Sequence, residues 1–163
     1  MAAGSTYDQI FTTTLTTAVS SVTISSIPAI YTDLVLIVNN KLVSGSSSLR
    51  IQFNGDTGTN YSGTQIYGYT SASSGRETST ATPYMGSEST GWGTHNLNIF
   101  SYANTSVYKT WTYRSGDVGV GIAEAGAYLW RSTSAISSIK LFDYSSNNFD
   151  IGSSFTLYGI AAA

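Results

Sequence analysis

The segment 54–60, NGDTGTN, has the residue types of a ligand-binding loop. The side chains of Asn54, Asp56 and Asn60 all offer oxygen atoms, and glycines lie among them. Such a segment could coordinate calcium, hydrogen-bond a sugar or form only a turn. Which of the three holds decides whether the chain is an enzyme, a lectin or a structural protein.

The spacing of this segment excludes a calcium loop of the EF-hand type. A loop that starts at Asp56 requires Asp or Asn at its third position, glycine at its sixth and Glu at its twelfth. The chain has Gly58, Tyr61 and Tyr67 at these places. An Asn-Gly pair after an alternating strand favours a hairpin turn, because both residues tolerate a positive φ. We therefore interpret the segment as a turn and expect no metal site, while a looser site of carbonyl groups and Asp56 stays open.

Few side chains could carry nucleophilic catalysis. His95 is the only histidine, and the chain has no cysteine. His95 shares a strand face with Leu97 and Ile99, which predicts a half-buried histidine at a strand end and not a general base. No serine lies in the G-x-S-x-G pattern of a nucleophile elbow, and the sequence has no Walker phosphate loop.

Two carboxylates are enough to hydrolyse a glycosidic bond, and the chain has 9 Asp and Glu residues. Most of them flank expected strands or turns. Glu124 is the exception because it lies inside the strand-like segment GIAEAGAYLW, and we expect it to pair with Arg114 or Arg131. We therefore expect no enzyme activity and no cofactor.

Sugar binding through exposed aromatic rings is a further alternative. Trp111 and Trp130 lie in expected strands and are predicted to be core residues, whereas Trp92 lies in an expected loop. A stand-alone carbohydrate-binding module therefore stays open as an interpretation.

The elements that position these side chains are expected to be strands. Apolar and polar residues alternate with a period of two, and helical spacing is rare. Many short strands separated by Gly, Pro and Asn-Gly turns favour one antiparallel sandwich or barrel domain spanning 1–163. We expect about eight strands, at 7–15, 20–25, 33–42, 48–53, 95–101, 107–115, 120–131 followed by 136–144, and 154–160.

One segment, 34–38, is apolar at every position (LVLIV). Such a run predicts a central strand that is covered on both faces. With the alternating strands it gives a predicted core, which comprises Leu34, Leu36, Val38, Leu49, Ile51, Phe53, Leu97, Ile99, Trp111, Ile139, Leu141, Phe155 and Leu157.

The segment 68–94 interrupts the alternation, and we interpret it as a long polar loop with at most one edge strand. A weak helical turn is expected just before it, near 60–67. A loop of this length is usually functional or disordered, and large apolar side chains in such a loop favour a contact surface. The candidate interaction surface comprises Tyr84, Met85 and Trp92 from the loop together with Tyr7 near the N-terminus.

Charge and composition limit the partners. The formal net charge is -2, which does not favour binding to nucleic acid. Only 10% of the residues are charged, against about 25% in an average chain. The start, MAAGSTYDQIF, lacks the pattern of a signal peptide, and no apolar stretch is long enough for a membrane helix. We expect neither nucleic acid nor a membrane as a partner.

Several stretches, in order along nearly the whole chain, resemble one family: SSVTISSIPAIYTDLVLIVN, LRIQFNGDTGTNYSGTQIYG, YLWRSTSAISSIKLF and GSSFTLYGIAAA. This pattern is similar to that of small virion structural proteins of tailed phages, many of them from aquatic and cyanobacterial hosts. The resemblance implies a jelly-roll β-sandwich that assembles as a homotrimer. The segment 68–94 departs most from the pattern.

Within that family, the resemblance implies either capsid decoration or a place at the tip of a tail fibre. We favour a capsid decoration or cement protein on the capsid surface, with the major capsid protein as partner. The sandwich pattern leaves only a short N-terminal arm, 1–6, and no room for a fibre stalk. A receptor-binding fibre module, with a host glycan as its ligand, is the alternative.

Overall fold

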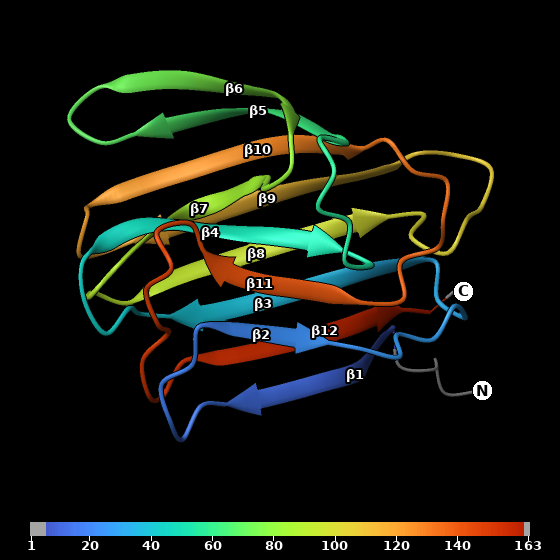
Figure 1. Cartoon of the computed structure of the whole chain (residues 1–163), viewed down its shortest axis with the longest axis horizontal. Coiled ribbons are helices and arrows are strands. Elements are labelled where there is room, and N and C mark those ends of the chain that lie inside the picture. The colour runs from blue at the N-terminus through green and yellow to red at the C-terminus, as the bar shows by residue number, and fades with distance from the viewer. Residues whose placement is uncertain (1–5, 162–163) are drawn as a thin grey trace.

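The computed structural model describes residues 6–161, which form twelve β-strands and no helix. The strands make two antiparallel sheets that lie face to face (Figure 1). The antiparallel β-sandwich is therefore confirmed, with twelve strands in place of about eight. Its jelly-roll topology stays a prediction.

The larger sheet has eight strands, and every neighbouring pair is antiparallel. Its inner face covers the core, and its outer face is open. In spatial order it consists of β1 (Tyr7–Thr14), β12 (Ser154–Ile160), β3 (Asp33–Asn40), β8 (Gly93–Phe100), β9 (Lys109–Asp117), β10 (Ile122–Trp130), β5 (Tyr61–Gly68) and β6 (Ala72–Thr80).

The smaller sheet has four strands and covers part of the larger one. Its strand β7 is an edge strand and lies against β9 and β10 of the larger sheet. In spatial order it consists of β2 (Ser21–Ile24), β11 (Ile139–Asp143), β4 (Ser46–Phe53) and β7 (Tyr84–Ser89).

Strands β5 (Tyr61–Gly68), β6 (Ala72–Thr80) and β7 (Tyr84–Ser89) lie where the sequence predicts a helical turn and a long loop. The helical turn expected near 60–67 is wrong, because these residues belong to β5. The long loop expected at 68–94 is also wrong, because it holds β6, β7 and the start of β8. Strand β6, ASSGRETST, has no apolar alternation because both of its faces are largely exposed. Strand β7, YMGSES, is buried although half of its side chains are polar, so its sequence does not indicate a buried strand.

The predicted core is confirmed at every one of its thirteen positions, each of which has a relative exposure of 0%. Period-two alternation succeeds here because each of these strands turns one face toward the opposite sheet. The cover expected on both faces of the run 34–38 is only partial. Leu34, Leu36 and Val38 lie in the core, Val35 is buried on the other face, and Ile37 is partly exposed.

Two tyrosine rings fill the inner face of the larger sheet by lying on glycines of the next strand. Tyr113 of β9 lies over its partner Gly126 of β10, and Tyr128 of β10 lies over its partner Gly63 of β5. Both phenols donate to Oε1 of Gln65, at 3.2 and 3.0 Å. Only glycine leaves room for a ring directly against the strand.

We expect Gly63→Ala to lower the free energy of unfolding by about 1–3 kcal/mol, because overpacking forces a held side chain to move. An added methyl group would lie 2.3 Å from the Tyr128 ring. Gly68→Ala on the same strand is the matched control, since nothing lies within 4 Å of its methyl group. Urea unfolding of both variants measures the difference, and equal midpoints would contradict this packing.

Candidate functional site

The NGDTGTN segment is a turn, as its sequence predicts. Asn54 and Gly55 both have positive φ, 54° and 68°, directly after β4. The Asn54 side chain ties this turn to the loop before β11. Its amide donates to the carbonyl of Ala135 at 2.7 Å, and its oxygen accepts from the amides of Ser137 and Ser138 at 2.8 and 3.1 Å.

Asp56 also serves the fold. Its carboxylate accepts hydrogen bonds from the Gly58 amide at 2.8 Å, from Asn60 and from Nε1 of Trp130 at 2.6 Å. Burial opposes ionisation, but the bonds from Trp130, Asn60 and Gly58 outweigh it and lower the pKa of Asp56. Within residues 6–161 no three His, Asp or Glu side chains gather closely enough to hold a metal ion.

The structure does not bring the candidate interaction residues together. Tyr84 and Met85 lie on β7 with exposures of 8% and 0%, so their expected place on the surface is wrong. Trp92 and Tyr7 are exposed, at 46% and 55%. The two residues lie at opposite ends of the sandwich. Trp92 is next to Gly93, which pairs with Asn40 at the end of β3. Tyr7 pairs with Ile160, which in turn pairs with Asp33 at the start of β3.

Glu124 lies on the buried face of β10. The pairing of Glu124 with Arg114 or Arg131 that the sequence predicts is wrong. Glu124 is 7% exposed and receives a hydrogen bond from the Tyr84 hydroxyl. Its second oxygen accepts from the Ser87 amide at 2.6 Å and from Oγ of Ser115 at 3.0 Å. Burial and the bond to Glu124 raise the pKa of Tyr84, so its phenol stays protonated and donates. Glu124 therefore fastens the edge strand β7 to the larger sheet.

A second carboxylate fastens the same strand from β6. Glu77 accepts from the Tyr84 amide at 3.1 Å and from the Tyr128 hydroxyl at 3.1 Å. Its other oxygen forms an ion pair with Arg50 of β4 at 2.6 Å. The Arg50 guanidinium lies between the rings of Tyr84 and Tyr144, at 5.1 and 4.5 Å from their centroids.

Further along β7, a buried cluster joins both sheets. His95 lies 3.1 Å from Oδ1 of Asn40, and Nδ2 of Asn40 donates to Glu88 at 2.5 Å. His95 is fully buried, not half-buried as expected, and this burial lowers its pKa to about 4. The neutral ring therefore donates to Asn40. Oε1 of Glu88 and Oδ2 of Asp143 are buried without a hydrogen-bond partner. Burial and Asp143 together raise the pKa of Glu88 to about 9.

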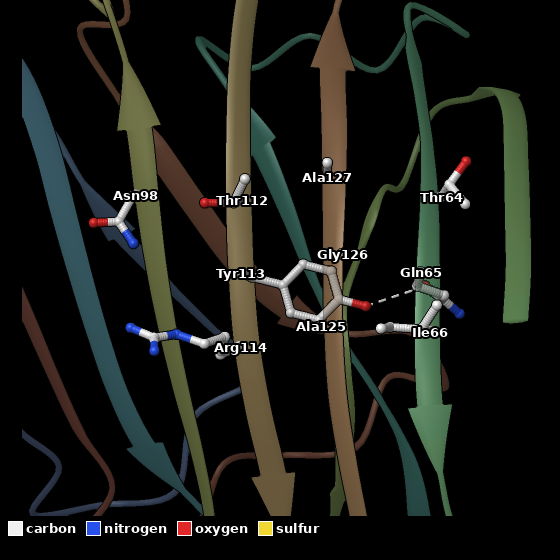
Figure 2. A pocket seen from close by; sticks show the side chains of 10 residues that line it. All are labelled: Thr64, Gln65, Ile66, Asn98, Thr112, Tyr113, Arg114, Ala125, Gly126 and Ala127. Carbon is white, nitrogen blue, oxygen red and sulfur yellow. Dashed lines mark hydrogen bonds between the residues drawn. The ribbon is translucent and has the colours of Figure 1, made fainter. Parts of the chain in front are cut away.

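The opposite, outer face of the larger sheet carries a trough over β9, β10 and β5. Its floor is Ala123, Ala125 and Ala127 of β10, whose outward side chains alternate with the buried ones. Figure 2 shows the last two alanines between the longer side chains of β9 and β5. Three adjoining hollows of about 580, 430 and 680 Å³ lie along this trough.

Cross-strand rows of side chains form the trough. One row runs Asn98, Thr112, Ala127, Thr64 and Arg76, from β8 to β6. The row beside it runs Asn96, Arg114, Ala125, Ile66 and Ser74. Each alanine is thus the shortest side chain of its row, and a guanidinium lies in each row.

The trough was not predicted from the sequence. The available signal was the spacing of three alanines at alternate positions of a strand whose other positions are Glu124, Gly126 and Tyr128. That spacing indicates that one face of the strand carries only small side chains. Only the pairing of β10 with β9 and β5 places longer side chains on both sides of it.

Neither the family models nor the curated proteins with which the chain was compared include a match. The part of the chain that the structure describes also has no helix of the length and apolarity that would cross a bilayer.

The buried cluster generates a prediction of pH dependence. Between pH 4.5 and about 9 the folded protein keeps a proton on Glu88 that the unfolded chain loses. This contribution to stability is complete below pH 4.5 and is lost as the pH rises through that window, because the unfolded state binds fewer protons. Glu88→Gln removes the titration, while its amide can still donate to Asp143. We expect a shallower fall of the urea midpoint from pH 5 to 8.5 in the variant.

Asp8→Asn is the control for this experiment, because Asp8 lies on the edge strand β1, outside the cluster. It removes one carboxylate from the chain and should keep the slope of the unsubstituted protein. A Glu88→Gln slope as steep as that of the control would show that Glu88 does not hold the proton.

Proposed function

We propose that this chain is a structural protein of a bacteriophage particle, which decorates and stabilises the capsid as a jelly-roll cement protein. The resemblance of its ordered sequence stretches to small virion proteins supports the proposal. The observation that carries it is an apolar surface at one end of the sandwich, which has the composition of a protein interface. We call it the Trp92 end, and it comprises Val43, Trp92, Val118 and Ile151.

Four loops build the Trp92 end, and contacts between them fix its shape. The amide of Val118 donates to the carbonyl of Trp92 at 3.1 Å. The Trp92 ring lies against Gly152, where a methyl group would be 3.5 Å from it, and Nζ of Lys41 lies 5.6 Å from its centroid. In Figure 1 the connections β3–β4, β7–β8, β9–β10 and β11–β12 all lie at the left end, away from the start of β1 and the end of β12.

The exposed side chains at this end are of the kind that interfaces bury. Val118, Ile151 and Val43 are 79%, 57% and 51% exposed. The nearby charges of Lys41 and Asp150 already form an ion pair at 2.8 Å. Exposed apolar side chains with few free charges nearby are typical of the centre of a protein interface. A capsid lattice offers such a partner in many copies, in this proposal through the major capsid protein.

Occupancy of purified phage particles tests this role. In particles assembled with Val118→Ser/Ile151→Ser protein, we expect a several-fold lower ratio of this chain to the major capsid protein by quantitative mass spectrometry. Ile30→Ser is the matched control, because Ile30 is 76% exposed and precedes β3, at the other end of the sandwich. Unchanged occupancy of the double variant would refute the Trp92 end as the contact. Co-purification with tail fibres in place of capsids would refute capsid decoration.

The edge strands of the larger sheet support a homotrimer as the assembled form. Strands β1 and β6 each have one side without a partner strand among the described residues. Exposed edges favour pairing with another chain unless they are covered. The proposed N-terminal arm, 1–6, lies outside the described residues except for Thr6, whose carbonyl accepts from the Ala161 amide at 3.1 Å. In this proposal the arm reaches a neighbouring capsid subunit.

If the protein is a homotrimer, its molecular mass in solution is three times that of one chain. Light scattering at micromolar concentration should give three times the 17.3 kDa of one chain. Three copies would cover six exposed sheet edges, which is the physical reason for the expected association. A mass equal to that of one chain would rule the trimer out.

A further inference from the structure

We infer that the trough on the outer face of the larger sheet binds an acidic polysaccharide, whose carboxylate groups meet Arg76 and Arg114. This site is separate from the Trp92 end and does not depend on capsid binding. Charge, shape and the pairing of the backbone each support it.

Of the 7 Lys and Arg residues of the chain, Arg76 and Arg114 are the two whose charged groups have no partner among the described residues. Arg76 and Arg114 have no hydrogen bond, ion pair or ring contact within residues 6–161. The other five cations all have partners. Lys41 binds Asp150, Arg50 binds Glu77, Lys109 donates to three carbonyls, Arg131 donates to Ser62 and Thr59, and Lys140 lies over Phe142.

Among the described residues, the strands β9, β10, β5 and β6 that form the trough present no carboxylate on the outer face that would neutralise these arginines. Strands β9, β10 and β6 carry Asp117, Glu124 and Glu77, and all three side chains make their hydrogen bonds on the inner side. Asp33, at the start of β3, accepts from the Ser101 amide at 2.7 Å. A chain with a formal charge of -2 thus has a locally positive trough, which attracts an anion.

One hollow of the trough, of about 430 Å³, has the side chains that sugar recognition uses. Arg76 lies on one side of it and Phe100, which is 40% exposed, on the other. Thr64, Thr110 and Thr112 lie between them. An aromatic ring offers a face to the C–H groups of a sugar, threonine hydroxyls bond its hydroxyls, and a guanidinium pairs with a carboxylate.

The pairing of the backbone favours a saccharide over a peptide. Strands β9, β10 and β5 are hydrogen-bonded to neighbours on both sides, so a peptide cannot add to them as a strand. The ligand must bind through side chains. The two arginines are three strand spacings apart, about 15 Å, which suits a polymer with widely spaced charges. A nucleic acid, with a charge on every nucleotide, would require more cations.

Isothermal titration calorimetry with three polymers tests the site. We expect the purified protein to bind polygalacturonate and to bind neither neutral dextran nor poly-glutamate. Arg76→Gln/Arg114→Gln should weaken the affinity for polygalacturonate by at least about tenfold, because charge-assisted hydrogen bonds are lost. Ala127→Tyr, which fills the trough floor from an exposed position, should weaken it comparably. Circular dichroism and the urea midpoint establish that both variants are folded.

Lys140→Gln is the matched control, since it removes one cation from the exposed face of the smaller sheet and should keep the affinity. Absence of binding to polygalacturonate would overturn the proposal. Equal binding to poly-glutamate would show simple attraction of any polyanion, and equal binding to dextran would show that the arginines have no part. A loss in Lys140→Gln as large as in the arginine variant would also overturn the site.

Discussion

The sandwich depends on how the edge strand β7 is held against the larger sheet. Carboxylates from two strands of that sheet bind β7 backbone amides: Glu124 accepts from Ser87, and Glu77 accepts from Tyr84. An edge strand with unpaired amides in the interior would be costly, because buried backbone donors require partners. Side-chain carboxylates replace the missing neighbouring strand. They let the four-stranded sheet end at β7 while the eight-stranded sheet continues over it to β5 and β6.

This arrangement also determines the charge of the outer surface. Because Glu77, Asp117 and Glu124 all bond on the inner side, the strands that carry them present no carboxylate outward. Their outward cations, Arg76 and Arg114, are left without acidic neighbours. These inward carboxylates accept hydrogen bonds from the hydroxyls and backbone amides of β7, which is why a buried strand carries polar side chains. One packing solution therefore accounts for a polar buried strand and for a positive trough on an otherwise weakly acidic chain.

Prediction from the sequence succeeded where one face of a strand is apolar. The thirteen core positions follow from alternation, and the turn at Asn54-Gly55 follows from the tolerance of both residues for positive φ. It failed where burial and polarity coincide. Strand β7 is polar and buried, and strand β6 is polar and exposed on both faces, so neither alternates. The sequence pattern therefore predicts Tyr84 and Met85 on the surface, although both side chains are buried.

The sequence by itself determined the β class, the core faces of six strands and the turn in NGDTGTN, because these depend on properties of neighbouring residues. Tertiary structure alone decided the partners of Glu124, the raised pKa of the buried Glu88 beside Asp143, and the trough. Glu124 is 37 residues from Ser87, and Arg76 is 38 residues from Arg114. Their relations arise only when strand order brings distant segments side by side. A local pattern records which face of a strand is apolar, but it does not record which strand lies next to it.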